Sequence, residues 1–553
     1  MSPYELHALN LPKLTGMGLQ AFTALVENLF TRPLLLGSLL ENGGIPKLRR
    51  RVLDEAPLFY PLVQPQTEFH SEPFPFQPGP PPDSFPFRTA RNYTTAYRSG
   101  SLSPLEAAEH VLAAIEASEQ GGTPLRAFIA VQRDDVLTQA RASAARYAAR
   151  APLSLLDDVP VAVKDEVDML PYPTTVGTRF LGKQPALRDA TVVARLRAAG
   201  ALLVGKANMH EIGINPNGAN ANHGPVRNPY NDSCDPGGSS SGPAAAIAAG
   251  LVPLSLGADG GGSIRIPAAL CGIVGLKPTF GRLSEAGAAP LCWSVAHLGP
   301  LAASVEDTAL GYALMAGPDP LEPNSLVQPP VTLEGWNKTD LRGLRLGIYR
   351  DWFNHASAEM VQACSAMLEK FKAAGAEVIE ITIPELDEMR IAHAVTILSE
   401  MSLCMKTYQQ QRGEHGAAVR LSLVLGDTFT ASDYLQAQRM RARAMTIFNG
   451  IYEKVDMIIS PATALAAQPV PANEAGAGWS DLGTDTEMMR FVFPGNLLGL
   501  PAIAFPAGYD RRGLPLGMQA MGRHWQEHLL LRLAYTAEKT MVRRLPARYY
   551  RIF

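Results

Sequence analysis

Two glycine-rich stretches decide how this sequence is interpreted: Asp235-Pro-Gly-Gly-Ser-Ser-Ser-Gly-Pro243 and Gly257-Ala-Asp-Gly-Gly-Gly-Ser-Ile-Arg-Ile-Pro267. Ordering glycine costs backbone entropy, so clustered glycines are kept where the chain must bend sharply or approach a ligand closely. The backbone amides of residues 260–263 can form a nest that binds a developing oxyanion. A glycine-rich turn between a strand and a helix is the plainer alternative, and glycine content alone leaves both open.

Other motif interpretations of these residues fail on detail. The glycine loops have no lysine after the last glycine and no GxGxxG spacing, so a phosphate-binding loop is not expected. Gly238-Ser-Ser-Ser-Gly242 matches the G-x-S-x-G elbow with Ser240 as nucleophile, but residues 231–237 have loop chemistry where the elbow needs a buried strand. His210-Glu211 begins like a zinc-binding helix motif, yet Ile214 stands where the second histidine belongs. We therefore interpret His210 as structural and expect no metal.

Short apolar runs separated by helical segments characterise the chain from about residue 152 onward. Six runs have the composition of buried strands: residues 159–163, 201–204, 251–256, 344–348, 457–460 and 502–505. Helical patterns cover residues 191–199 and 360–374 between them. Strands that alternate with helices predict an α/β protein whose mostly parallel or mixed sheet is covered by helices on both faces.

The first 87 residues differ from the rest in proline content and in their secondary-structure pattern. Residues 1–57 have the pattern of short helices, and residues 61–86 carry nine prolines, which disfavour helix and central strand and indicate an extended strap. A helix start follows, with Ser103 as N-cap, Pro104 in the first turn and Glu106 completing a capping box. We predict a helical extension with a proline-rich strap over residues 1–87 and one large domain over residues 88–553.

Composition and charge argue against several classes of protein. The 553 residues carry a formal net charge of −3, which gives no electrostatic reason to expect nucleic acid as a partner. The five cysteines include no CxxC pair, which argues against a zinc site and a disulfide framework and favours an intracellular compartment. The amino-terminal residues lack the pattern of a secretory signal.

The most apolar early stretch covers residues 19–40. Glu27, Asn28, Arg32 and Pro33 interrupt it, so it lacks the roughly 20 apolar residues of a spanning helix. Its apolar side chains can pack on the core or on a second copy of the chain, or they can contact a lipid surface or a substrate channel. We keep both alternatives and expect a cytoplasmic or peripherally membrane-associated protein.

The spacing of the motifs carries a resemblance to a known family. Ser239 and Ser263 lie 24 residues apart, and Val159-Pro-Val-Ala-Val-Lys-Asp165 places Lys164 75 residues before Ser239. With Gly205-Lys-Ala-Asn-Met-His-Glu-Ile-Gly213 and Gly272-Ile-Val-Gly-Leu-Lys-Pro278, these motifs resemble the amidase signature family over residues 90–540. That resemblance implies a central mixed, twisted sheet flanked by helices, and amide hydrolysis without histidine.

Two further segments are similar to the plant-type fatty acid amide hydrolases of that family: Leu386-Asp-Glu-Met-Arg-Ile-Ala-His393 and Thr486-Glu-Met-Met-Arg-Phe-Val492. The long apolar amino-terminal extension is also similar. One departure is Ala258, where the family usually has threonine.

The resemblance implies a role for each motif residue. Ser263 is the acylating nucleophile, Ser239 relays its proton and Lys164 is the base. A lysine accepts a proton only when neutral, and burial at the end of an apolar strand disfavours its charged form. The oxyanion donors are the backbone amides of Gly260, Gly261, Gly262 and Ser263. Arg265 anchors the nucleophile loop, and Ser240 and Ser241 satisfy the loop backbone or hold Lys164. Asp165 and Asp259 orient hydrogen bonds or cap loop amides.

The implied function is hydrolysis of carboxylic amides, favouring fatty acid amides such as N-acylethanolamines, without a cofactor. The alternatives are an amidase for small or aryl amides and the glutaminase subunit of a tRNA amidotransferase, which the amino-terminal extension disfavours. An intact lysine and both serines disfavour a non-catalytic scaffold. The expected partners are a lipid-like small molecule, a membrane surface contacted through the amino-terminal segment, and a second copy of the chain in a homodimer.

Overall fold

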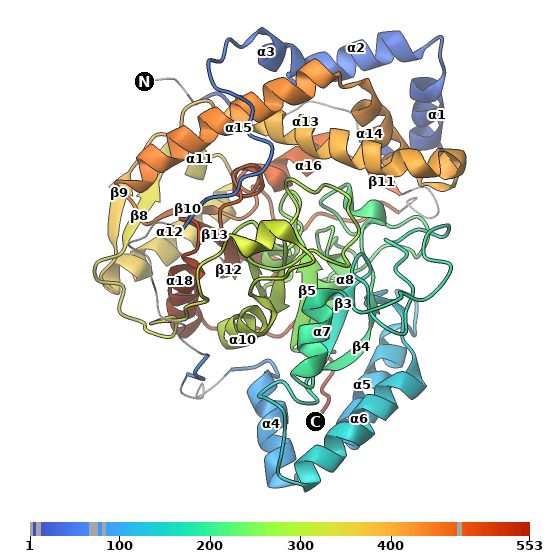
Figure 1. Cartoon of the computed structure of the whole chain (residues 1–553), viewed down its shortest axis with the longest axis vertical. Coiled ribbons are helices and arrows are strands. Elements are labelled where there is room, and N and C mark those ends of the chain that lie inside the picture. The colour runs from blue at the N-terminus through green and yellow to red at the C-terminus, as the bar shows by residue number, and fades with distance from the viewer. Residues whose placement is uncertain (1–3, 7–12, 66–75, 80–84, 473–477) are drawn as a thin grey trace.

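The computed structural model describes residues 4–6, 13–65, 76–79, 85–472 and 478–553. Within these residues one large sheet lies between helical layers (Figure 1). In spatial order its eleven strands are β2 (Phe128–Ala130), β4 (Leu202–Ala207), β3 (Pro160–Lys164), β5 (Leu254–Ala258), β7 (Leu298–Ala302), β6 (Val274–Lys277), β12 (Ala502–Tyr509), β13 (Pro515–Gly522), β10 (Met457–Pro461), β8 (Arg345–Ile348) and β9 (Glu377–Glu380).

The sheet is mixed. β3 pairs in parallel with β4 and β5, and β8 pairs in parallel with β9 and β10. The neighbouring strands from β5 across to β10 pair antiparallel. Every residue of β3 and β5 is buried, as expected for strands covered on both faces. The fold class predicted from the sequence is confirmed.

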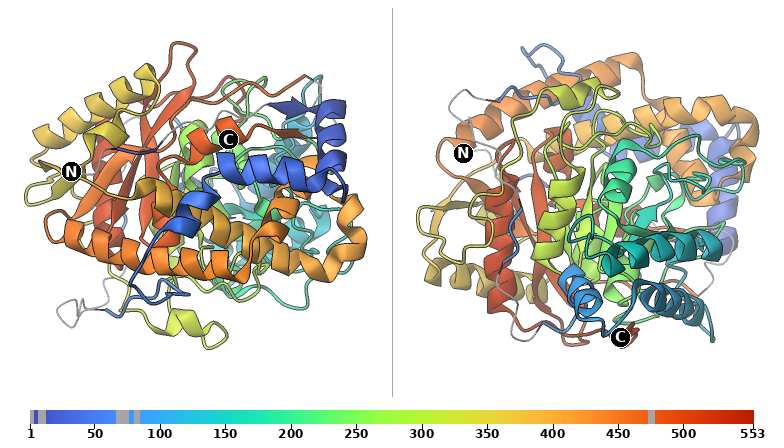
Figure 2. Two further views of the ribbon diagram at one scale, coloured as in Figure 1. Left: turned by 90° about the horizontal axis from the view of Figure 1, so that it is seen from above. Right: turned by 60° about the horizontal axis from the view of Figure 1, so that its bottom comes forward.

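Helices cover both faces of this sheet (Figure 2). Helices of the large domain that pack close to this sheet are α4 (Ala90–Ser99), α5 (Pro104–Ser118), α6 (Arg133–Ala148), α7 (Thr191–Ala198), α8 (Ser241–Ala248), α9 (Arg265–Leu270), α10 (Val305–Met315), α11 (Arg350–Phe353), α12 (Ala358–Ala373), α17 (Phe493–Leu497) and α18 (Glu527–Thr540). The helices predicted at residues 191–199 and 360–374 are α7 and α12.

All six predicted strands are present, as β3, β4, β5, β8, β10 and β12. The strand predicted at residues 251–256 begins only at Leu254, directly after Pro253, which cannot donate a ladder hydrogen bond. The predicted capping box of α5 is also present. The Ser103 hydroxyl accepts from the Glu106 amide at 3.2 Å, and the Glu106 carboxylate accepts from the Ser103 amide at 2.8 Å.

A separate helical layer lies beyond the sheet. It contains α13 (Leu386–Met405), α14 (Ala417–Thr428), α15 (Ala431–Tyr452) and the short α16 (Leu482–Met489). The amino-terminal helices α1 (Gly16–Glu27), α2 (Arg32–Asn42) and α3 (Ile45–Arg50) lie outside this layer (Figure 1). Among the described residues, none of the helices combines the length and apolar character that crossing a bilayer requires.

The amino-terminal extension contacts the large domain at several places. One is α3, where Arg49 donates to the Asp433 carboxylate of α15 at 2.7 and 2.9 Å. Leu19 and Val26 of α1 are buried in a cluster with Leu421 and Val424 of α14. The two-residue strand β1 (Leu14–Thr15) pairs antiparallel with β11 (Trp479–Ser480), shortly before α16. The described parts of the proline-rich segment have no regular structure, and residues 66–75 and 80–84 lie outside the described residues. The domain boundary at residue 87 stays a prediction.

Candidate active site

Lys164 and the loop that carries Ser263 meet at one edge of the sheet. Lys164 is the last residue of β3 and Ala258 the last residue of β5, and these strands are parallel neighbours. Because the carboxyl ends of parallel strands share an edge, the residues after Ala258 lie beside Lys164. Ser239, just before α8, completes the arrangement. The Lys164 Nζ lies 2.8 Å from the Ser239 Oγ and donates to the Ala258 carbonyl at 3.1 Å.

Ser239 sits in a tightly packed segment. The Gly238–Ser239 peptide bond is cis. The Gly238 amide donates to the Pro216 carbonyl at 2.9 Å, and the His210 amide donates to the Ser239 carbonyl at 3.1 Å. A Cβ on Gly238 would lie 2.1 Å from the Asn217 carbonyl oxygen, so this position needs glycine. Ser239 and Lys164 are both 1% exposed, so their contact is shielded from water.

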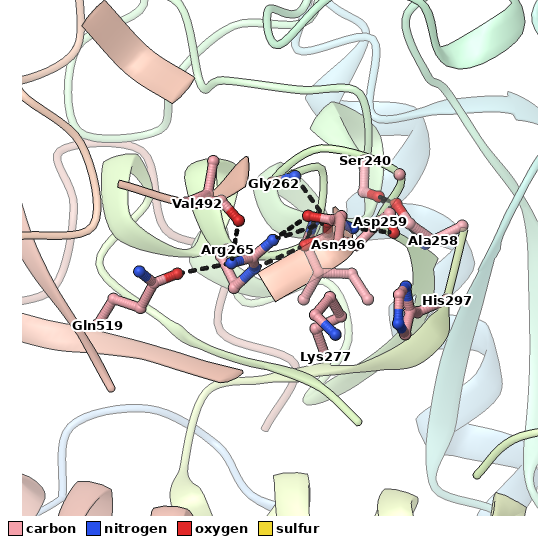
Figure 3. Close-up of polar contacts among 12 residues, drawn as sticks. Ser240, Ala258, Asp259, Gly262, Arg265, Lys277, His297, Val492, Asn496 and Gln519 are labelled. Carbon is pink, nitrogen blue, oxygen red and sulfur yellow. Dashed lines mark hydrogen bonds and ion pairs between the residues drawn. The ribbon is translucent and has the colours of Figure 1, made fainter. Parts of the chain in front are cut away.

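The loop after β5 is built around Asp259 (Figure 3). Its carboxylate accepts from the amides of Gly262 and Ile264 at 2.6 and 3.1 Å, and Arg265 contacts it with two nitrogens at 3.0 and 3.1 Å. Burial alone would raise the pKa of Asp259, but the charge and hydrogen bonds of Arg265 outweigh burial and hold that pKa below its usual range. Arg265 also donates to the Val492 carbonyl at 2.9 Å. These contacts hold the loop in one conformation and join it to the segment that carries Val492.

The amide of Gly262 is not free to bind an oxyanion, because it donates to Asp259. This corrects the inclusion of Gly262 among the predicted oxyanion donors. No protein acceptor contacts the amides of Gly260, Gly261 and Ser263 in the part of the chain that the structure describes. These three amides remain the predicted donors.

His393 of α13 fixes the orientation of one of those amides. Its Nε2 lies 2.8 Å from the Gly260 carbonyl oxygen. Burial lowers the pKa of His393 to about 4, so the ring is neutral at pH 7 and the Nε2 proton faces that oxygen. In a trans peptide the next N–H points the opposite way, so this bond turns the Gly261 amide away from His393.

Ser240 and Ser241 occupy supporting positions. The Ser240 hydroxyl donates to the Ala258 carbonyl at 3.1 Å, and its amide donates to the Ser263 carbonyl at 3.2 Å. Ser240 therefore links the end of β5 to the nucleophile loop. The Ser241 hydroxyl is buried at the start of α8 and has no hydrogen-bond partner within the described residues. No hydrogen bond joins the Ser263 hydroxyl to Ser239 in that same part of the chain, so the relay between them stays a prediction.

Asp165 and His210 lie near the site, and each contacts nearby groups of its own surroundings. The Asp165 carboxylate accepts from the Thr175 hydroxyl and, at 2.9 Å, from the Gly177 amide, which orients that loop. The His210 Nδ1 lies 3.1 Å from the Glu211 carbonyl, and burial lowers the His210 pKa to about 4. No group of three or more His, Cys, Asp or Glu side chains is arranged to hold a metal ion within the described residues.

Sequence reasoning missed two residues of the site. Glu166 places its Oε2 2.8 Å from the Lys164 Nζ, and His393 contacts Gly260 as described above. Glu166 lies in the turn that follows β3, where the Val167 amide donates to the Lys164 carbonyl at 3.1 Å, so strand periodicity does not indicate it. No local signal indicates His393, because more than one hundred residues separate it from its partner.

An apolar cavity of about 170 Å³ adjoins the nucleophile loop. Its lining comes mainly from α13, α14 and α16, and includes His393, Ile397, Leu398, Leu425, Met489 and Phe493. A Cβ on Gly261 would lie 2.9 Å from both the His393 Cε1 and the Met489 Cε, so the loop and the cavity wall are in direct contact. Polar and charged side chains also line this cavity: Asn215, Arg390, Ser422, Asp485, Thr486 and Arg490.

The chain is similar to known proteins of one enzyme family. The family model described as Amidase matches residues 107–531, which include Lys164, both glycine-rich loops and most of the sheet. Fold and match together define an enzyme that hydrolyses carbon–nitrogen amide bonds. The chain belongs to the amidase signature family.

The relatives fall into several groups within that family. A fatty acid amide hydrolase of Medicago truncatula is 39% identical, with 99% of this chain and 96% of the relative covered. A component of the glutamyl-tRNA(Gln) amidotransferase of Thioalkalivibrio sulfidiphilus is 36% identical over 83% of this chain and 99% of the relative. Among solved structures, the peptide amidase of Stenotrophomonas maltophilia superposes with a TM-score of 0.72 at 26% identity, covering 83% of this chain and 98% of that one.

Proposed function

We propose that this chain hydrolyses fatty acid amides such as N-acylethanolamines, through an acyl-enzyme formed by Ser263, Ser239 and Lys164. The observation that carries the proposal is the buried contact of 2.8 Å between the Lys164 Nζ and the Ser239 Oγ, next to the anchored loop that presents Ser263. A buried lysine and serine in contact can move a proton without histidine.

The mechanism follows from these positions. The Ser263 oxygen attacks the amide carbon while its proton passes to Ser239 and the Ser239 proton passes to neutral Lys164. The amides of Gly260, Gly261 and Ser263 receive the negative oxygen of the tetrahedral intermediate. The reverse relay then protonates the amide nitrogen, the amine leaves, and an ester remains on Ser263. Water attacks this ester by the same relay and releases the carboxylic acid.

The apolar cavity supports an acyl-chain substrate. It adjoins the nucleophile loop, and its wall includes the aliphatic and aromatic side chains of Ile397, Leu398, Leu425 and Phe493. Burying an acyl chain contributes about 0.8 kcal/mol per methylene group. The Medicago truncatula relative is a fatty acid amide hydrolase and is similar over 99% of this chain, including the amino-terminal extension.

The amino-terminal helices supply a surface for lipid contact. One face of α1 packs on α14, whose Leu425 lines the cavity. The connection from α1 to α2 and the first turn of α2 expose Leu29, Phe30 and Leu34 at 78%, 91% and 80%. Adjacent exposed apolar side chains of this size are typical of an interfacial segment that rests on a bilayer. We propose that this corner contacts a membrane near the cavity, and a homodimer interface is the alternative occupant.

A second candidate function has support from the comparisons. The Thioalkalivibrio sulfidiphilus relative is part of a glutamyl-tRNA(Gln) amidotransferase, and the match to it leaves part of this chain uncovered. The uncovered share fits the presence of an extension, and favours the fatty acid amide hydrolase assignment. A small-amide amidase remains the third candidate.

A substrate panel tests the assignment. Hydrolysis of acetamide, an anilide, glutamine and a long-chain N-acylethanolamine is measured under one condition. We expect kcat/KM to be highest for the N-acylethanolamine, by at least about 100-fold over acetamide, because each buried methylene adds binding energy. A higher kcat/KM for glutamine or for the anilide would contradict the lipid assignment and leave the amidase mechanism intact.

Deleting residues 1–57 is expected to raise KM for a long-chain amide by about 10-fold or more and to change KM for acetamide little. The physical reason is that α1 supports α14, and α14 lines the cavity. Melting temperature is measured beside the kinetics. An equal loss of activity on both substrates would show that the extension is structural.

A companion variant separates lipid contact from support of the cavity. Replacing Leu29, Phe30 and Leu34 together with serine changes only exposed side chains, so the melting temperature should stay unchanged. Sedimentation with phosphatidylcholine vesicles should fall for this variant if the corner contacts lipid. Unchanged sedimentation with a dimer-to-monomer shift in light scattering would assign the corner to a second copy of the chain.

A further inference from the structure

The Lys164 amine has three polar neighbours. Its Nζ lies 2.8 Å from the Ser239 Oγ, 3.1 Å from the Ala258 carbonyl oxygen and 2.8 Å from the Glu166 Oε2. The side chains of Lys164 and Glu166 are 1% and 9% exposed, so water does not screen their contact as it would at the surface. The mechanism described above uses the first of these neighbours and leaves Glu166 without a role.

The chemistry of the three neighbours differs. A neutral amine has two N–H donors and one lone pair, and an ammonium group has three donors and no lone pair. The Ala258 carbonyl and the Glu166 carboxylate can only accept, whereas the Ser239 hydroxyl can donate. With both N–H groups of neutral Lys164 taken by Ala258 and Glu166, the lone pair is left for the Ser239 hydroxyl proton.

We propose that Glu166 is a positioning residue of the active site, which aims the lone pair of Lys164 at Ser239 and stabilises the ammonium group formed when Lys164 takes the proton. This inference rests on the proposed role of Lys164 as base. The proton moves from Ser239 to Lys164 and back. Glu166 contacts the Lys164 Nζ and acts through Lys164.

Other ionisable groups around the pair are engaged or neutral. Asp165 is held by Thr175 and Gly177, and it lies 3.6 Å from the Lys206 Nζ on β4. Asp259, which follows Ala258, is paired with Arg265. Burial is the main cause of the remaining shifts: it lowers the pKa values of His210 and Lys206, and it raises those of Cys292 and Glu285. Glu166 is therefore the charged partner in contact with Lys164.

The role predicts a shift in the pH dependence of the reaction. A carboxylate beside an amine favours the protonated amine, so removing it lets the amine become neutral at a lower pH. Because the rate requires neutral Lys164, Glu166→Gln should move the acidic limb of the kcat/KM profile to lower pH by about 1 to 3 units. The glutamine oxygen can still accept an N–H, so the plateau should stay within about 10-fold of the unmodified enzyme. Glu166→Ala removes both functions and should lower the plateau by about 100-fold.

Matched variants make the experiment decisive. Glu166→Asp keeps the charge and shortens the reach, so its limb should stay near that of the unmodified enzyme. Asp168→Asn removes a carboxylate that contacts Thr174 instead of Lys164, and its limb should not move. Melting temperature is recorded for every variant, and each pH profile is measured at a temperature where all the variants are folded.

The possible results separate this inference from the proposed function. An acidic limb that disappears in Lys164→Ala but does not move in Glu166→Gln would overturn the role of Glu166 and leave Lys164 as the base. An acidic limb that persists in Lys164→Ala would overturn the proposed base itself. A limb displaced to lower pH in Glu166→Gln alone, with Asp168→Asn unchanged, would establish the positioning role.

Discussion

Replacing Ser263 with alanine is expected to abolish formation of the acyl-enzyme and to lower kcat/KM by on the order of 10⁵-fold or more. The loss follows because no other hydroxyl is presented by the loop that Asp259 and Arg265 hold in place. Single-turnover mixing with a chromogenic amide should show no burst of released amine. The loop keeps its anchors in this variant, so its melting temperature should be close to that of the unmodified enzyme.

Ser240→Ala is the matched control for this substitution. The Ser240 hydroxyl contacts only the Ala258 backbone in the described part of the structure. Its loss removes one buried hydrogen bond, so we expect a cost of about 1 kcal/mol in stability and retention of substantial activity. Loss of acylation in Ser240→Ala, with acylation kept in Ser263→Ala, would favour the elbow interpretation of Gly238-Ser-Ser-Ser-Gly242.

Lys164→Ala is the second prediction with a large effect. It should lower kcat by about 10² to 10⁴-fold, the range for loss of a general base, and remove the rise of the rate with pH. The measurement is a pH–rate profile of kcat/KM from pH 5 to 10. A profile that keeps its rise would contradict the assignment of Lys164.

The same substitution leaves Glu166 buried without its partner. Leaving a buried carboxylate without its hydrogen-bond donor costs its desolvation energy, so Lys164→Ala should also lower the melting temperature. The double variant Lys164→Ala with Glu166→Gln removes the orphaned charge. We expect it to recover much of the lost melting temperature while remaining inactive, which separates the loss of the base from a loss of folding.

The sequence predicted the strands that carry the site because they are apolar on both faces. The runs that became β3 and β5 are continuous and buried, and these two strands position Lys164 and the nucleophile loop. The strands β7 and β13 were not predicted. Each contains glycine and proline, as in Leu298-Gly-Pro-Leu-Ala302, and these residues are unfavourable in a strand. Pairing with neighbouring strands overrides that local preference.

The long helices of the layer beyond the sheet were missed for a different reason. α15 begins with a capping box of Thr430 and Asp433, which is visible in the sequence, but its apolar positions are scattered among arginines. The sequence predicted that Asp259 orients hydrogen bonds or caps loop amides, but it did not indicate that Gly262 supplies one of those amides. Loop hydrogen bonds depend on where a side chain points, and motif spacing does not contain that information.

The contact of His393 with Gly260 shows the same limit at longer range. His393 lies on α13, and only the packing of that helix against the nucleophile loop brings the two residues together. Sequence reasoning could place Lys164, Ser239 and Ser263 by motif, whereas the groups that orient them come from elements joined by the tertiary fold.

Covalent labelling tests the central claim, that Ser263 is the nucleophile, most directly. The intact enzyme is treated with a fluorophosphonate, which reacts with an activated serine, and the modified residue is identified by peptide mass mapping. We expect modification of Ser263, with labelling abolished in Ser263→Ala and strongly slowed in Lys164→Ala. Modification of Ser240 instead, or equal labelling of the Ser263→Ala variant, would contradict the assignment of Ser263.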